Sequence, residues 1–302
     1  MATKLKPLNE QVVVITGASS GIGLATAEEA AKQGAKLVLA ARSKNTLDEI
    51  VQRITSAGTE AVAVECDVSD RQQVESVATA AIGRFGRIDT WVNNAGLGMY
   101  GRLDETPEAD AKRLFDINFW GVVNGCQAAL PHLKRNGGAL INVGSEVSDA
   151  YIPVLGIYVA SKHAVKGYTD VLRVEVEEVD KAPVSITLIQ PTATDTPFPE
   201  HARNFMDHDA KLPTPMIDPQ RVAEAILDAA VSPTREKTVG AMAKVNKLLS
   251  KVAPGLADKM SAHQTDRMHR DAPPRNPEGA LDQPSEALAT AGRTHGACEK
   301  KE

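Results

Sequence analysis

Residues 12–23 read VVVITGASSGIG, and the architecture of the chain follows from this stretch. The apolar, β-branched run Val12–Thr16 predicts a buried strand, and the composition of residues 24–33 predicts a helix after it. The glycine-rich turn between them permits close approach of the backbone to a phosphate group. The N–H groups and dipole at a helix start favour such a negative charge. The junction therefore predicts a dinucleotide site.

Strands and helices alternate along the rest of the chain. Further strands are predicted at residues 36–41, 61–65, 90–93, 139–143, 184–190 and 237–240. Helices are predicted at residues 70–85, from Thr106-Pro107 onward, at 158–179 and at 218–231, with Asp70, Thr106 and Asp218 as caps. This alternation predicts an α/β fold with a doubly wound parallel β-sheet and helices on both faces. Ligands bind such sheets beyond the carboxyl ends of the strands.

Ser145, Tyr158 and Lys162 form a second informative pattern. Tyr158 and Lys162 are four residues apart, so on a helix they share one face. The pKa of a free tyrosine is about 10, and a lysine ammonium together with an oxidised nicotinamide ring would lower it. Lowering this pKa to about 7 needs roughly 4 kcal/mol of differential interaction. Ser145, after a predicted strand, would hydrogen-bond the reacting oxygen, so the three residues indicate a carbonyl/alcohol redox site.

The order and spacing of these motifs resemble the classical short-chain dehydrogenase/reductase family over roughly residues 8–240. The matching segments are Thr16-Gly17, Gly21-Ile22-Gly23, Asn93-Asn94-Ala95-Gly96, Asn118, Ser145 and Tyr158-Val159-Ala160-Ser161-Lys162. The resemblance implies a single Rossmann-type domain that uses a nicotinamide cofactor, with Asn118, Ser145, Tyr158 and Lys162 as catalytic residues. In the family the asparagine bends its helix and holds a water in a proton relay through the lysine. The alternative is that Asn118 only supports a local kink.

The cofactor is expected to be NADP(H), because Ala41-Arg42-Ser43 ends the second predicted strand where a carboxylate would favour NAD. Arg42 can make fork-shaped, charge-assisted hydrogen bonds to a 2′-phosphate. The alternative is a solvated arginine at a helix start. The resemblance also places Asp67 beside the adenine, unless it caps the next helix. The expected cofactor-binding residues are Gly17, Ser19, Ser20, Gly21, Ile22, Gly23, Arg42, Ser43, Asp67, Val68, Asn94, Ala95, Gly96, Tyr158, Lys162, Pro191, Thr194 and Thr196.

Two features bear on the substrate. Thr192 replaces the glycine that usually follows the family's proline, which puts the local backbone in doubt because glycine takes a positive φ cheaply and threonine does not. Residues 97–100, 146–153 and 193–219 are expected to line the pocket, the last of these as a lid. Glu146 and Asp149 argue mildly against a strongly anionic substrate, unless both are solvated loop residues.

The chain divides into a catalytic domain (residues 1–240), an amphipathic C-terminal helix (241–259) and a flexible or extended tail (260–302). The helix carries lysines opposite its apolar positions. It could dock on its own domain or on a sister subunit, touch an anionic membrane surface, or be largely unstructured.

Composition narrows the class of protein further. The chain has 302 residues, 42% of them hydrophobic, and a net charge of −5, which gives no reason to expect nucleic acid. Cys66, Cys126 and Cys298 form no CxxC pair, which suggests a reducing compartment and no disulfide framework, and their neighbours suggest no metal site. No apolar stretch predicts a signal peptide or a bilayer span. We therefore expect a cytoplasmic homodimer or homotetramer with no membrane or nucleic-acid partner.

The predicted function is an NADP(H)-dependent oxidoreductase that interconverts a ketone or aldehyde and an alcohol, with Tyr158 as general acid/base. One alternative is an NAD-dependent alcohol dehydrogenase working oxidatively. The other is a dinucleotide-binding redox sensor with little turnover.

Overall fold

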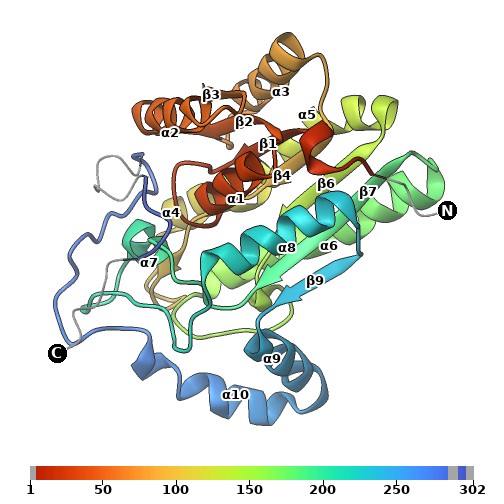
Figure 1. Ribbon diagram of the computed structural model, residues 1–302. Coiled ribbons are helices and arrows are strands. Elements are labelled where there is room, and N and C mark those ends of the chain that lie inside the picture. The colour runs from red at the N-terminus through yellow and green to blue at the C-terminus, as the bar shows by residue number, and fades with distance from the viewer. Residues whose placement is uncertain (1–4, 285–291, 297–302) are drawn as a thin grey trace.

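The computed structural model describes residues 5–284 and 292–296 (Figure 1). Its main sheet has seven parallel strands in the order β3-β2-β1-β4-β6-β7-β9. In chain order these strands are β1 (Val12–Thr16), β2 (Lys36–Ala41), β3 (Ala61–Glu65), β4 (Thr90–Asn93), β6 (Gly138–Val143), β7 (Val184–Pro191) and β9 (Glu236–Val239). Two short strands, β5 (Met99–Tyr100) and β8 (Arg203–Asn204), pair in a separate parallel sheet.

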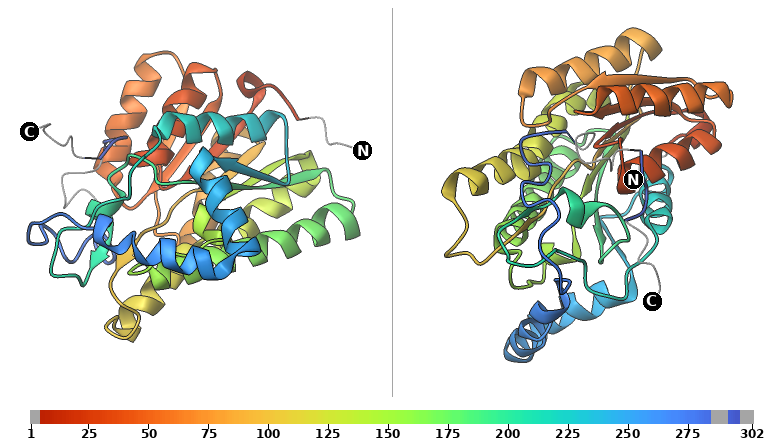
Figure 2. Two further views of the ribbon diagram at one scale, coloured as in Figure 1. Left: turned by 90° about the horizontal axis from the view of Figure 1, so that it is seen from below. Right: turned by 90° about the vertical axis from the view of Figure 1, so that its left-hand side faces the viewer.

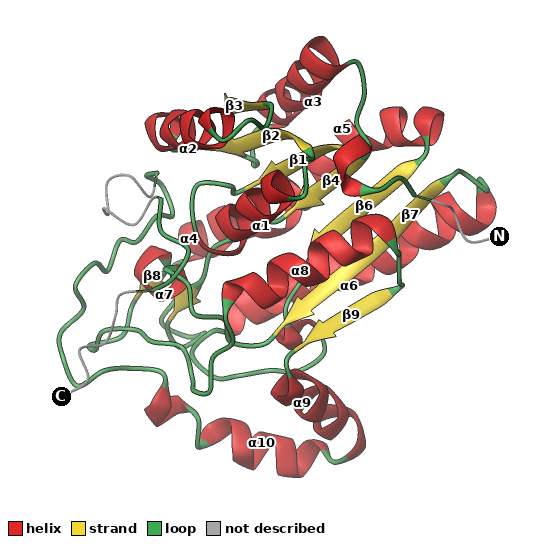
Figure 3. Cartoon of the chain, in the orientation of Figure 1, coloured by secondary structure: helices red, strands yellow, loops and turns green. Residues whose placement is uncertain are grey.

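Helices cover both faces of the main sheet (Figure 3). One face carries α1 (Gly21–Lys32), α2 (Lys44–Ser56) and α8 (Pro219–Val231). The other carries α3 (Arg71–Phe85), α5 (Gly121–Asn136) and α6 (Gly156–Arg173). The predicted Rossmann-type, doubly wound α/β fold is confirmed.

The central strand β1 shows why its sequence is apolar throughout. Val13 and Ile15 lie in the core cluster under α1, α2 and α8, whereas Val12 and Val14 lie in the cluster on the other face. Side chains alternate along a strand, so a strand covered on both faces needs an apolar residue at every position. All five residues of β1 are accordingly buried.

The order of the strands creates the crevice where a ligand can bind. From β1 the chain moves outward to β2 and β3 and then returns to β4 on the other side of β1. The connections diverge at this switch point and leave a crevice beyond the carboxyl ends of the strands. Gly17, Asn94 and Ser145 follow β1, β4 and β6 there, and Pro191 ends β7.

Two of the three predicted helix caps are confirmed. Asp70 and Asp218 accept hydrogen bonds from backbone N–H groups in the first turns of α3 and α8. The prediction for Thr106 was wrong: α4 (Glu108–Phe115) begins after Pro107, and the Thr106 hydroxyl donates to the carbonyl of Arg102. The predicted helix over residues 158–179 is α6 followed by a π-helical segment, η4 (Val174–Val179).

The predicted C-terminal helix is divided into α9 (Ala241–Val252) and α10 (Pro254–Ala262). Pro254 has no N–H group and disfavours a helical conformation at Ala253, so the first helix ends there. Helix α9 lies on its own domain, where Asn246 donates to the carboxylate of Glu146 at 3.2 Å.

The described part of the predicted tail has little regular structure but packs against the domain (Figure 2). Met268, Ala280 and Leu281 are almost completely buried, and the Ala280 N–H donates to the carbonyl of His201 in α7 (Phe198–His201). Residues 285–291 and 297–302 of the predicted tail, including Cys298, lie outside the described residues. Within residues 5–284 and 292–296, no helix has the length and apolar composition needed to cross a bilayer.

Candidate active site

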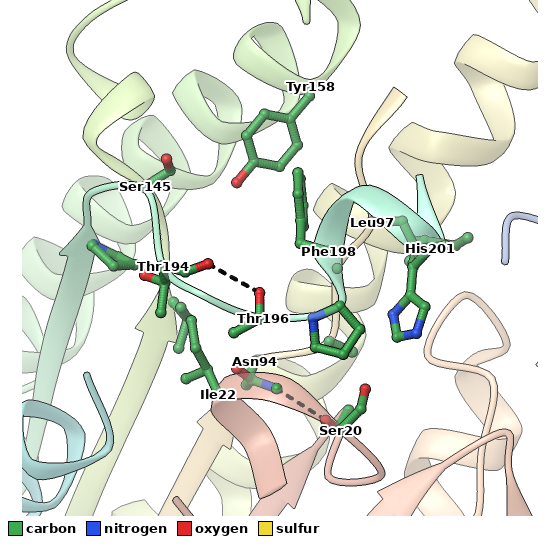
Figure 4. Close-up of a pocket in the computed structure, with 18 of the residues that line it drawn as sticks. Ser20, Ile22, Asn94, Leu97, Ser145, Tyr158, Thr194, Thr196, Phe198 and His201 are labelled. Atoms are coloured by element: carbon green, nitrogen blue, oxygen red, sulfur yellow. Dashed lines mark hydrogen bonds between the residues drawn. The ribbon is translucent and has the colours of Figure 1, made fainter. Parts of the chain in front are cut away.

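A cavity beyond the ends of β1, β4, β6 and β7 brings the two predicted groups of residues together (Figure 4). Ser145, Tyr158 and Lys162 line it. The predicted cofactor-binding residues that also line it are Gly17, Ser19, Ser20, Gly21, Ile22, Arg42, Ser43, Asp67, Val68, Asn94, Ala95, Gly96, Pro191, Thr194 and Thr196. Gly23 and Asn118 are absent from its wall among the described residues.

The glycines of the turn after β1 have conformations and contacts that other residues could not reproduce. Gly17 and Gly21 have φ values of +67° and +54°, in the left-handed region that glycine adopts at low cost. A Cβ on Gly23 would lie 2.2 Å from the carbonyl oxygen of Gly17. Gly23 therefore allows the helix to pack closely against the backbone of Gly17, on the side of the turn away from the cavity. The exposed backbone of the turn fits a pyrophosphate group.

Tyr158 lies in the first turn of α6, and its ring packs edge-on against Phe198 with the ring centroids 5.3 Å apart. Burial raises the pKa of Tyr158 to about 12, and the hydrogen bond from Ser145 opposes only part of this rise. The nearby Glu146 carboxylate raises the pKa further. The lowered pKa expected from the sequence requires an oxidised nicotinamide beside Lys162, and the residues of the chain do not produce it by themselves. A positive charge bound beside the ring would lower this pKa.

Lys162 lies one turn further along α6, with its Nζ atom 5.8 Å from the Tyr158 ring centroid. The ammonium donates to the carbonyl oxygen of Val143 at 2.9 Å, and the side chain is 4% exposed. Burial lowers the pKa of Lys162 to about 8. The folded protein therefore holds a proton here that it releases far more readily than an exposed lysine would.

This buried lysine should make folding stability depend on pH. Because its pKa falls from 10.5 to about 8 on folding, the unfolded chain binds more protons between these values. The free energy of unfolding should therefore rise with pH across that window. We expect Lys162→Met to remove about 2 kcal/mol of the rise between roughly pH 7.5 and 9.5, measured by urea denaturation.

The matched control is Lys244→Met, which changes an exposed lysine of α9 and should leave the pH dependence unchanged. If Lys162→Met and the unchanged protein gained the same stability over this range, Lys162 would not be the titrating group.

Asn118 lies in the π-helical segment η2 (Asp116–Trp120) that joins α4 to α5. Its side-chain oxygen accepts from the Leu97 N–H at 2.8 Å, and its amide group donates to the Leu97 carbonyl at 2.9 Å and to the Ser161 hydroxyl at 3.1 Å. Through these hydrogen bonds, Asn118 connects the segment that follows β4 to helix α6. Leu97, held in this way, lines the cavity.

Arg42 contacts a part of the chain that its sequence neighbourhood does not suggest. Its guanidinium donates to the carbonyl oxygens of Ala280 and Leu281, in the described part of the tail. Ala280 itself lines the cavity. Nearer the glycine-rich turn, the Gly21 N–H donates to the carbonyl of Arg293 at 2.8 Å. The tail thus lies across the predicted phosphate-binding residues.

Asp67 also has partners that sequence reasoning missed. Its carboxylate accepts from Arg113 of α4 at 2.6 Å and from the Ser69 hydroxyl at 2.7 Å. These hydrogen bonds and the charge of Arg113 outweigh burial and lower the pKa of Asp67. A second guanidinium therefore lies in the neighbourhood of Arg42, brought there by α4.

The backbone at Thr192 is ordinary, which resolves the doubt raised by its replacement of glycine. Of the described non-glycine residues, only Val154 and Lys181 have a positive φ. The Thr192 methyl group instead occupies the space beside Gly240, where an added Cβ would lie 2.5 Å from it. Thr192 lines the cavity, and its side chain fits there because residue 240 is a glycine.

The predicted lid supplies Phe198, His201, Leu212 and Pro213 to the cavity wall. Burial lowers the pKa of His201 to about 4, so this side chain is neutral at ordinary pH. Sequence reasoning missed Ala280, because nothing in a polar, proline-containing segment indicates which part of the domain it will cover.

Comparison with known proteins identifies the family. A parallel sheet with a cavity at its switch point is typical of proteins that bind a dinucleotide. The profile described as "short chain dehydrogenase" matches residues 11–207. The chain is also 45% identical, over 260 residues, to the uncharacterized oxidoreductase YxnA of Bacillus subtilis (strain 168), which covers 85% of this chain and 73% of that protein. This protein belongs to the short-chain dehydrogenase family and is an oxidoreductase.

Two solved structures are similar over most of their lengths. One is the alcohol dehydrogenase from the archaeon Thermococcus sibiricus complexed with 5-hydroxy-NADP, with a TM-score of 0.66 and 33% identity over 76% of this chain and 94% of that one. The other is a short chain dehydrogenase/reductase from Burkholderia phymatum in complex with NAD, with a TM-score of 0.76 and 29% identity over 83% of this chain and 96% of that one.

Proposed function

We propose that this protein is an NADP(H)-dependent oxidoreductase that interconverts a ketone or aldehyde and an alcohol. The observation that carries the proposal is the shared cavity: Ser145, Tyr158 and Lys162 line the same space as the glycine-rich turn and Arg42. A proton donor and a dinucleotide-binding surface in one cavity are what carbonyl reduction requires. The similarity to an alcohol dehydrogenase complexed with 5-hydroxy-NADP supports it.

Each catalytic side chain has a role in this proposal. The bound cofactor supplies or accepts the hydride. Tyr158 donates its proton to the carbonyl oxygen in reduction and takes it back in oxidation, while the Ser145 hydroxyl hydrogen-bonds the same oxygen. Lys162 orients the cofactor ribose, and the positive charge of a bound oxidised nicotinamide would lower the Tyr158 pKa from about 12. Asn118 positions a water that restores the proton through Lys162.

Different residues around the cavity bind different parts of the cofactor in this proposal. The turn from Gly17 to Gly23 holds the pyrophosphate, Asp67 and Val68 the adenine, and Asn94 to Gly96 the adenosine ribose. At the other end Pro191, Thr194 and Thr196 hold the nicotinamide. The 2′-phosphate binds Arg42, with Ser19 and Ser43 as neutral donors.

An NAD-dependent alcohol dehydrogenase working oxidatively is the second candidate. Arg42 already donates to two tail carbonyls, so its guanidinium has a structural partner without a 2′-phosphate. The similarity to a dehydrogenase in complex with NAD is consistent with this candidate. A redox sensor is a weaker candidate, since a sensor needs no proton donor with a lysine beside it.

The test is a titration of the purified full-length protein with NADPH and NADH, followed by cofactor oxidation against a panel of ketones, aldehydes and diketones. We expect tighter binding of NADPH and turnover of at least one carbonyl compound. Tighter binding of NADH with turnover would favour the second candidate. Tight binding without any turnover would favour the sensor.

We further propose that the protein is a cytoplasmic homodimer or homotetramer. Val171, Val174 and Val179 are exposed along α6 and η4, with exposures of 59%, 48% and 73%. Such a row of exposed valines is suited to contact with a second copy. Light scattering should give two or four times the chain mass of 32.1 kDa, and a monomer at micromolar concentration would contradict this proposal.

A further inference from the structure

A second cavity adjoins the active-site cavity, and we call it the outer cavity. Glu146, Thr192, Ala193 and Pro213 line both cavities, so the two spaces adjoin each other at these residues. The outer cavity has a volume of about 470 Å³, which lies within the range of about 300–1,000 Å³ that small-molecule sites occupy.

The remaining wall of the outer cavity comes mostly from the C-terminal extension. Its residues belong to α9, to α10 and to the segment that leads into the 3₁₀ turn η5 (Thr265–Arg267). These elements lie beyond residue 207, where the match to the family profile ends. The outer cavity is therefore built by a part of the chain that the shared catalytic fold does not supply.

Two cationic side chains that have no carboxylate partner among the described residues line the outer cavity. Lys259, His263 and Arg267 follow one another at intervals of four residues, on successive turns of α10 and the segment after it. Among the described residues, no carboxylate lies within 4.0 Å of the charged groups of Lys259 or Arg267. Neighbouring Lys247, which lies outside this cavity wall, is paired with Asp149 at 3.0 Å.

Neither Asp149 nor Glu146 cancels this positive charge. Asp149, which the sequence suggests as an argument against an anionic substrate, is 6% exposed in its side chain and paired with both Lys247 and Lys251. The acidic residue in the outer wall is Glu146, at the border with the active-site cavity. Its carboxyl accepts a hydrogen bond from Asn246, and burial raises its pKa, which favours the neutral form.

The apolar surfaces and the charged side chains lie at different places along the two cavities, which favours one orientation of a bound molecule. Phe198, Ile152 and Leu212 make the active-site cavity apolar beside Tyr158, and Met242 and Met260 make part of the outer wall apolar. An anionic group is favoured beside the cations Lys259 and Arg267, and it is disfavoured in the apolar surroundings of Tyr158. A neutral carbonyl group is the part that suits the Tyr158 end.

We propose that the substrate is an elongated carbonyl compound, or the corresponding alcohol, whose far end is a carboxylate bound by Lys259 and Arg267 in the outer cavity. Its apolar body lies along Pro213, Met242 and Met260 while its carbonyl group reaches Tyr158. This inference rests on the proposed function, because it names the substrate class of the same active site.

The experiment compares straight-chain keto acids of increasing length with their methyl esters, using the full-length protein and NADPH. At the chain length that spans both cavities, kcat/KM for the acid should exceed that for the ester by about 10-fold, because the acid alone makes charge-assisted hydrogen bonds. Lys259→Ala/Arg267→Ala should bring the two within about 2-fold by weakening the acid only. Added salt should reduce the preference in the unchanged protein.

A matched control removes the same amount of charge elsewhere. Lys244→Ala/Arg221→Ala changes two exposed residues outside both cavity walls and should keep the full preference for the acid. Ester turnover without a preference for the acid would overturn this inference and leave the proposed function intact. Retention of the preference in Lys259→Ala/Arg267→Ala would also overturn it. Failure of every acid and every ester, with turnover of another ketone or aldehyde, would overturn this inference and leave the proposed function intact. Failure of all carbonyl compounds would overturn both.

Discussion

Replacing Tyr158 with phenylalanine is expected to lower kcat by about two to four orders of magnitude, which is the usual contribution of a positioned general acid. The variant lacks one hydroxyl group and keeps the ring, so the edge-on contact with Phe198 at 5.3 Å should persist. The cofactor surface formed by the glycine-rich turn is untouched. NADPH should therefore bind with nearly unchanged affinity, which fluorescence titration measures alongside steady-state turnover.

The matched control for this variant is Tyr168→Phe, three turns further along the same helix. Tyr168 packs edge-on against Phe119 and is absent from the described wall of the active-site cavity. Its loss of a hydroxyl should leave turnover unchanged. The assignment of Tyr158 as proton donor fails if Tyr158→Phe keeps more than about half of normal turnover, because general-acid catalysis contributes far more than this.

Replacing Arg42 with alanine is expected to weaken NADPH binding by about 10- to 100-fold while leaving NADH binding nearly unchanged. Hydrogen bonds to a charged group contribute about 1.5–3 kcal/mol, and each 1.4 kcal/mol corresponds to about 10-fold in affinity. In the structure the guanidinium donates to two neutral tail carbonyls, and a phosphate dianion is the stronger acceptor. Isothermal titration with both cofactors measures the two affinities.

The pattern of change separates the two functions open to Arg42. If the arginine only anchors the tail, NADPH and NADH should be affected equally in Arg42→Ala. If neither affinity changes, Arg42 contributes to the binding of neither cofactor. Arg42→Lys is the informative intermediate, since lysine keeps the charge but lacks the planar fork and should recover only part of the NADPH affinity.

Local sequence patterns predicted much of the fold because they depend on neighbours in the chain. The run of β-branched residues before Gly17 is apolar on both faces, which is the requirement of a central parallel strand. Asp70 and Asp218 cap their helices with their own side chains, a contact that spans only a few residues. Thr106 failed as a cap because its hydroxyl could bond backward to Arg102 as readily as forward.

The approach of Ser145, Tyr158 and Lys162 to the glycine-rich turn could also be anticipated. In a parallel sheet the carboxyl ends of all strands meet at one edge, so residues after β1 and β6 are brought together by topology alone. The pKa of Tyr158 could not be anticipated in the same way. Its direction depends on burial by Phe198 and other side chains from distant elements, and this burial outweighs the local hydrogen bond from Ser145.

Order and spacing along the chain thus determined the sheet, the helices on both faces and the position of a redox site at the strand ends. Only the tertiary structure decided that Arg42 meets Ala280, 238 residues away, and that Lys259 and Arg267 line a cavity beside Glu146. The physical reason is that the preference of a segment for a strand or a helix depends on interactions among residues that are close together in the sequence. The path of the irregular C-terminal segment instead depends on which of its side chains can be buried on the surface of the folded domain. Met268 is one side chain that is buried in this way.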